Sequence, residues 1–133
     1  RHHHASYRRQ RQMCIRRQGD TSEMASGIIS LDSCSVLIHE ATFLDEYSKH
    51  AKEYLHSTAS GAARTALECG AGHLVLTHYG ARIKQADEPT SEAMKVLANS
   101  KISVTAANDG DRILVGDNGV VHHLSWMGNG WSS

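Results

Sequence analysis

Two short apolar runs organise the chain, and a histidine follows each of them. The runs cover residues 36–38 and 74–76, and the histidines are His39 and His78. The polar and alanine-rich sequence between the runs has apolar positions at helical spacing. This pattern predicts a strand, a helical crossover and a second, parallel strand, because uninterrupted apolar runs are typical of strands buried on both faces.

The same periodicity predicts further elements around this unit. They are helices at residues 44–55, 59–67 and 92–98, a strand at residues 102–107 and a hairpin at residues 112–124. Gly70 lies where a glycine commonly ends the second of these helices. Residues 126–133 are rich in glycine and serine, so we expect a flexible tail there.

Length and composition fit a single globular domain. The chain has 133 residues, of which 40% are hydrophobic and 21% charged, and these ordinary values name no function. Charge is divided unevenly, because residues 1–18 carry six arginines and no acid, whereas the remainder has a net charge of −6 with neutral histidines. We therefore divide the chain into a basic segment (1–18), a folded part (19–125) and a tail (126–133).

The basic segment has two interpretations. A basic arm can bind nucleic acid through contacts with phosphates. The run His2, His3 and His4, however, resembles the remnant of an affinity tag, and the segment has no apolar periodicity. Residues 14–18 are too charged for a buried strand, so we expect no strand leading into Gly19.

Neither a membrane span nor a disulfide framework is indicated. No run approaches the roughly 18 apolar residues of a membrane span, and residues 1–18 lack the apolar core of a secretory signal. Cys14, Cys34 and Cys69 are odd in number and far apart, as expected for free thiols in a reducing compartment. We expect a cytoplasmic protein without membrane contact.

Polar side chains gather where the two predicted strands end. Binding sites in open α/β sheets lie outside the carboxyl ends of strands, so His39, His56 and His78 form a candidate site. Glu40 or His39 could orient another polar group there, or the members of the segment His39-Glu40-Ala41-Thr42 could cap the next helix. A histidine that closes a strand is also a common structural residue.

Segments on both sides of the crossover helix fit an anionic ligand. Ser57 or Thr58 can cap this helix, whose N-terminus suits a phosphate, and His56 just before it could donate a proton to a leaving oxygen. After the second strand, His78 could bind a metal and Arg82 could contact an anion.

Asp20 lies in the turn-prone sequence Gly19-Asp20-Thr21. Glycine permits a tight turn, and the aspartate beside it could aim its carboxylate into a cleft. Asp20 or Thr21 could instead cap a short helix that includes Met24. The residues alone leave both possibilities open.

Several short motifs occur in a fixed order along the chain. They are GDT at 19–21, LIHEATF at 37–43, HST at 56–58, LVLTHYGAR at 74–82 and NDG at 108–110. This order closely resembles the C-terminal half of ribonuclease Z, the tRNA 3′-processing endonuclease of the metallo-β-lactamase fold. The resemblance covers about residues 19–115. It implies an α/β fold, namely half of an αββα sandwich with a mixed sheet, flanking helices and a C-terminal β-hairpin.

The resemblance also implies roles for individual residues. Asp20 would bridge two zinc ions, His78 would bind one of them, and His56 would be the proton donor near the scissile phosphate. The residues that would support the site or contact substrate phosphates are His39, Glu40, Thr42, Ser57, Thr58 and Arg82. These roles are chemically coherent, because a two-metal site activates water at neutral pH and stabilises the charge of phosphodiester displacement.

The sequence departs from this family in its ligand set. The family's His-x-His-x-Asp-His motif and a further histidine, both from the N-terminal half of the domain, are absent from the 133 residues. Asp20 and His78 supply two ligands, which are too few for a dinuclear centre. Gly80 and Ile83 also stand where the family pattern S-x-R-Y has serine and tyrosine.

We therefore expect a zinc-dependent endoribonuclease that cuts precursor tRNA just beyond the acceptor stem with metal-activated water and leaves a 3′-hydroxyl on the tRNA. This chain alone should be inactive, and we expect a homodimer or a complementing N-terminal half as its partner. Two alternatives stay open. A phosphodiesterase or arylsulfatase of the same fold would hydrolyse small esters, and a non-catalytic fragment would lack a full metal site.

Overall fold

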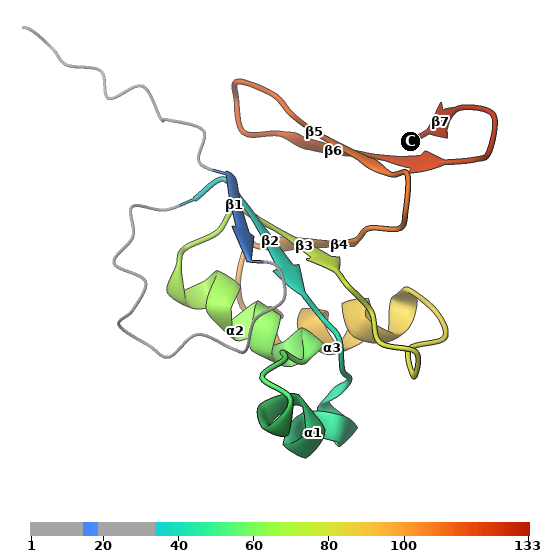
Figure 1. Cartoon of the computed structure of the whole chain (residues 1–133). Helices are drawn as coiled ribbons and strands as arrows, with labels where there is room; N and C mark the ends of the chain where they lie inside the picture. Colours follow the sequence, from blue (N-terminus) through green and yellow to red (C-terminus); the bar gives the residue numbers. More distant parts are fainter. Residues whose placement is uncertain (1–14, 19–33) are drawn as a thin grey trace, which may run out of the picture.

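The computed structural model describes residues 15–18 and 34–133, and these residues form two sheets (Figure 1). The first sheet is parallel, in the strand order β1 (Ile15–Gln18), β2 (Val36–Glu40), β3 (His73–Thr77) and β4 (Ser103–Ala106). The second sheet is antiparallel and consists of β5 (Arg112–Val115), β6 (Val121–Trp126) and β7 (Trp131–Ser132). The predicted α/β architecture with helices and a C-terminal β-hairpin is confirmed, and the hairpin of β5 and β6 belongs to the second sheet.

The predicted strand–helix–strand unit is confirmed. β2 and β3 pair in parallel, with Val36 opposite His73, and α2 (Ala59–Glu68) makes the crossover between them. Small alanine side chains on α2 pack against buried leucines of the sheet. Figure 1 shows α2 and α3 (Asp87–Val96) on one face of the parallel sheet, with the antiparallel sheet beyond its other face.

The remaining helices differ in detail from those that the sequence predicts. The helix expected at residues 44–55 is a 3₁₀ turn, η1 (Asp45–Tyr47), followed by the short helix α1 (Ser48–Glu53). α3 begins five residues earlier than expected, because Pro89 is tolerated in the first turn of a helix. None of the helices in residues 34–133 or 15–18 is long and apolar enough to cross a membrane.

Two segments predicted to lack strands contain them. β1 pairs with β2 at the edge of the parallel sheet, where Ile15 is 54% exposed. The charged side chains of this segment are unsuited to a buried strand, but they are compatible with an exposed edge strand. In the expected flexible tail, β7 pairs with β6 and places Trp131 opposite Trp126. Gly128, with φ 88°, lies in the turn between these two strands, where its freedom to adopt positive φ is needed.

Candidate functional site

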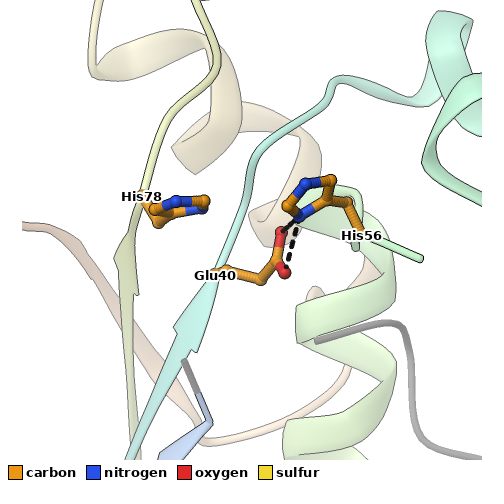
Figure 2. Close-up of side chains that lie close together, drawn as sticks. All are labelled: Glu40, His56 and His78. Carbon is orange, nitrogen blue, oxygen red and sulfur yellow. Dashed lines mark hydrogen bonds and ion pairs between the residues drawn. The ribbon is translucent and has the colours of Figure 1, made fainter. Parts of the chain in front are cut away.

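The ends of β2 and β3 and the start of α2 bring three side chains together. Glu40 is the last residue of β2, His78 follows β3, and His56 lies just before α2 (Figure 2). One ligand atom from each residue lies within 4.8 Å of the others. The sequence placed both histidines and Glu40 at this edge of the sheet, but it left the role of Glu40 open.

The Glu40 carboxylate is fully buried and surrounded by hydrogen-bond donors. His56 Nδ1 lies 3.1 Å from both of its oxygens, and the Ser57 backbone N–H donates to Oε2 at 3.2 Å. Because an ionised carboxylate only accepts hydrogen bonds, Nδ1 of His56 carries a proton. Glu40 thereby fixes the orientation of the imidazole, and Nε2 is the atom through which the ring can exchange a proton.

Thr42 connects this pair to His78. Its hydroxyl contacts the Glu40 carboxylate and also lies 2.9 Å from Nδ1 of His78. A hydroxyl has one proton, and the contact with Glu40 is the shorter, so Thr42 donates to Glu40 and accepts from Nδ1–H of His78. Nε2 of His78 then carries a lone pair, which is the form in which an imidazole binds a metal.

The backbone at His78 has an uncommon conformation. Its φ angle is 56°, in the left-handed region that residues other than glycine rarely adopt. Such conformations are often found at functional sites, where surrounding contacts hold them. Here Nδ1 of His78 lies 2.9 Å from the Thr42 hydroxyl and the side chain is exposed, so the sharp turn after β3 presents the imidazole to the cluster.

Close packing explains the glycine at position 80. A Cβ atom on Gly80 would lie 2.4 Å from the Thr42 carbonyl oxygen, which accepts a hydrogen bond from the Gly80 N–H at 3.0 Å. The serine expected from the family pattern does not fit this backbone position. The loop after His78 is therefore fixed directly against Thr42.

The other predicted residues surround the cluster without entering it. Thr58 provides the N-cap of α2, because its hydroxyl accepts from the Gly61 N–H at 3.0 Å, whereas Ser57 contributes its backbone N–H to Glu40. His39 is buried, and its Nδ1 donates to the Glu40 carbonyl oxygen at 2.9 Å. Arg82 is exposed on the loop after β3. Asp20 lies outside the described residues.

One neighbour of the cluster, Phe43, is the last residue of the LIHEATF motif, but the sequence assigned it no role. The ring of Phe43 lies 6.0 Å from that of His56, centroid to centroid, in a tilted arrangement. Its backbone N–H and carbonyl also bond to Ser57 and Ala59, at 3.2 and 3.1 Å. Phe43 thus fixes the segment that carries His56, a contact that depends on the tertiary fold and not on spacing along the chain.

The cluster offers a partial set of metal ligands. His78 fits a zinc ligand, because its Nδ1–H is anchored and its Nε2 is a lone-pair donor. The Glu40 oxygens already accept from His56, Ser57 and Thr42, so Glu40 fits better as the residue that orients His56 than as a ligand. Zinc usually takes four ligands. Within the described part of the chain, the three groups can contribute to a metal site but cannot complete one.

Comparison with solved structures places this arrangement in a known fold. The metallo-β-lactamase fold protein YhfI from Bacillus subtilis superposes with a TM-score of 0.64 at 25% identity, over 84% of this chain and 40% of that one. The two layers of sheet and the helices are therefore part of a metallo-β-lactamase fold.

Sequence comparison narrows the resemblance to ribonuclease Z. The chain is 40% identical over 86 residues to ribonuclease Z of Halalkalibacterium halodurans and 45% identical over 75 residues to that of Bacillus velezensis. These matches cover 64% and 53% of this chain, which spans only 28% and 24% of the relatives' own lengths. No protein-family model matches the chain. The predicted resemblance to ribonuclease Z is confirmed.

Proposed function

We propose that the chain is the C-terminal part of a zinc-dependent endoribonuclease of the ribonuclease Z type, which processes tRNA 3′ ends. The observation that carries this proposal is the buried Glu40 carboxylate, which orients the ring of His56. His56 in turn lies beside His78, whose imidazole is a side chain that commonly binds metal ions. The similarity to ribonuclease Z and the metallo-β-lactamase fold support it.

The chain would contribute part of a two-zinc site. When bound, the two ions would activate a water and stabilise the charge that develops on the phosphate. His78, through Nε2, and Asp20 would hold the ions. The remaining ligands would be supplied by a complementing N-terminal half. A homodimer is the alternative assembly.

His56 would act as the general acid. Glu40 accepts from Nδ1–H, so a proton on Nε2 of the charged ring can pass to the leaving 3′ oxygen and produce a 3′-hydroxyl on the tRNA. Thr42 and the Ser57 backbone N–H hold the Glu40 carboxylate in place. His39 braces the Glu40 backbone.

Two other groups would contact substrate phosphates. The N-terminus of α2, capped by Thr58, would contribute the positive end of the helix dipole. Arg82 is an exposed cation on the loop that follows His78. Together they would attract the RNA backbone to the edge of the sheet.

The test compares this chain alone with the chain copurified with the N-terminal half of the Halalkalibacterium halodurans relative. Zinc is measured by inductively coupled plasma mass spectrometry, and cleavage of a precursor tRNA is followed under multiple turnover. We expect the combined preparation to bind zinc and to cut just beyond the acceptor stem, and the chain alone to do neither.

Two outcomes would contradict this proposal. Multiple-turnover cleavage by the chain alone would show that its own residues complete the site. A zinc-loaded combined preparation that hydrolyses small phosphate or sulfate esters and leaves precursor tRNA intact would assign the fold to another hydrolase.

A further inference from the structure

Two of the three cysteines meet in the folded chain. Sγ of Cys34 lies 3.6 Å from Sγ of Cys69, although 35 positions separate the two residues in the sequence. Cys34 lies just before β2, and Cys69 is the C-cap of α2. Both side chains are 2% exposed and belong to the hydrophobic core that α2 forms with the parallel sheet. Spacing along the chain predicts separate thiols, so the pair is a product of the tertiary fold.

The backbone holds both cysteines in place. The carbonyl of Cys34 accepts from the Gly72 N–H at 3.0 Å. The N–H of Cys69 donates to the Thr65 carbonyl at 3.0 Å, as in the last turn of a helix. Gly70, with φ 58°, then turns the chain back toward the start of β2. The end of the helix and the start of the strand are therefore fixed beside each other, with the two sulfur atoms in contact.

This contact is close to the geometry of a disulfide. A disulfide has an S–S bond of about 2.05 Å and needs two side chains that point toward each other. The side chains of Cys34 and Cys69 already do so, because their sulfur atoms lie 3.6 Å apart. Rotation about the Cα–Cβ bonds, with a small adjustment of the backbone, brings the atoms to bonding distance.

The pair lies close to the protein surface. Cys69 is flanked in the sequence by Glu68 and Gly70, which are both exposed, and Gly72 beside Cys34 is exposed as well. The ends of helices fray, and such a local opening of the last turn of α2 admits a small oxidant. Burial thus slows the reaction of these thiols without preventing it.

We propose that Cys34 and Cys69 form an oxidisable dithiol, which a hydroperoxide converts into an intramolecular disulfide. One cysteine, as a thiolate, attacks a peroxide oxygen and the O–O bond breaks. The departing hydroxide takes up the proton that the thiol has lost, so the products are a sulfenic acid and water. The second cysteine attacks the sulfenic sulfur, the S–O bond breaks, and another water leaves. Two thiols are oxidised by two electrons, and hydrogen peroxide is reduced to two waters.

The disulfide locks the unit that carries the candidate site. Glu40 and His56 lie at the opposite ends of β2 and α2 from the two cysteines, so the bond touches neither of them. It closes a loop across 35 positions, which restricts the unfolded chain and thereby stabilises the folded one. In a reducing compartment the pair stays a dithiol, and oxidative conditions close it. The inference is independent of the proposed function.

Peptide mapping identifies the linked residues. The full chain is treated with hydrogen peroxide at low protein concentration, alkylated with iodoacetamide in urea and digested with trypsin. We expect the peptides 18–49 and 65–82, which contain Cys34 and Cys69, to be joined and to lack the mass of two hydrogen atoms. The peptide 12–16, which contains Cys14, should be linked to neither. Dithiothreitol should separate the joined peptides again.

The same oxidation of the unfolded chain is the control for the role of the fold. In concentrated urea the ease of closing a loop decides which cysteines pair. Cys14 and Cys34 are 20 positions apart, so their pairing should exceed that of Cys34 with Cys69. A preference for the longer loop in the folded chain alone is the signature of the contact between the two sulfur atoms.

Urea unfolding measures the consequence of the bond. In a Cys14→Ser chain, peroxide should raise the midpoint of unfolding by about 1–2 M. Cys34→Ala and Cys69→Ala, each added to Cys14→Ser, retain one thiol and should show no such rise. Each variant is compared with itself before and after oxidation, so a loss of stability caused by the substitution does not affect the comparison.

Four results would overturn the proposal. They are peptides 18–49 and 65–82 that stay separate after oxidation, the same links in the folded and unfolded chains, an unchanged midpoint in the linked chain, or an equal rise in the variants with one thiol. Neither zinc nor RNA takes part in these measurements, so such a failure leaves the proposed function standing. Conversely, a combined preparation that cannot cut precursor tRNA leaves the disulfide unaffected.

Discussion

Nδ1 of His56 lies 3.1 Å from both carboxylate oxygens of Glu40, sixteen positions earlier in the chain. The carboxylate is fully buried, and burial of a charge is costly unless hydrogen-bond donors surround it. His56, the Ser57 backbone and Thr42 are those donors. The same bonds that allow the carboxylate to be buried therefore also fix the direction of the His56 ring.

Glu40→Gln should disturb the protonation pattern of His56. A glutamine side chain has a donor as well as an acceptor, so it no longer requires a proton on Nδ1. We expect the nitrogen-15 spectrum of the His56 ring to shift toward a mixture of tautomers. Glu53→Gln, on the exposed surface of α1, is the matched control and should leave the spectrum unchanged. An unchanged spectrum in Glu40→Gln would show that Glu40 does not orient the ring.

Thr42→Val should destabilise the fold. The substitution keeps the shape of the side chain but removes the hydroxyl that bonds to Glu40 and His78. Loss of one donor to a buried carboxylate costs about 1–3 kcal/mol, and urea unfolding measures the difference. Thr42→Ser retains the hydroxyl and should lose much less. Equal stability of Thr42→Val and wild type would argue against the connecting role of Thr42.

Gly80→Ala should also lower the free energy of unfolding, for a steric reason. Its Cβ would lie 2.4 Å from the Thr42 carbonyl oxygen, so the backbone of the loop must move. Overpacking of this kind costs about 1–3 kcal/mol. Gly130→Ala is the matched control, because nothing lies within 4 Å of its added Cβ, and it should change stability by less than about 0.5 kcal/mol. Two variants of equal stability would be inconsistent with close packing at Gly80.

Tyr79 should make stability pH-dependent in alkaline solution. Burial raises the pKa of Tyr79 to about 12, and its hydroxyl donates to the Leu76 carbonyl at 2.7 Å. The folded state therefore favours the protonated phenol, whose stabilising contribution is complete below the unfolded pKa of about 10 and is lost as the pH rises toward 12.

Tyr79→Phe should remove this alkaline dependence. Urea unfolding at about pH 8 and pH 11 should show a smaller decrease for the variant than for wild type. Tyr54→Phe, at a side chain that is 63% exposed, should behave like wild type. If wild type and Tyr79→Phe lose the same stability between the two pH values, Tyr79 is not the group responsible.

The sequence was sufficient to predict the arrangement that places the site. Apolar runs and helical spacing predicted β2, α2 and β3, and the parallel pairing of these strands brings His78 next to the residues that follow β2. These features are local, because periodicity and helix caps are encoded within a few residues. The edge strand β1 escaped prediction, because an exposed edge does not need an apolar run.

Contacts between distant residues could not be predicted from spacing alone. Thr42 bonds to His78, which lies 36 positions later, and Gly80 packs on the Thr42 carbonyl. The contact of Arg82 with Tyr47 is of the same kind. Each depends on how the loops after β2 and β3 meet, and the order of residues along the chain does not determine that geometry.

Replacement of the leaving 3′ oxygen by sulfur tests most directly whether His56 is the proton donor. In the combined preparation, His56→Ala should slow cleavage of normal precursor tRNA by about 10²–10⁴-fold under single turnover. A thiolate leaves without a proton, so a substrate with a 3′-bridging sulfur should be cut by the variant at nearly the wild-type rate. An equal defect on both substrates would contradict proton donation by His56.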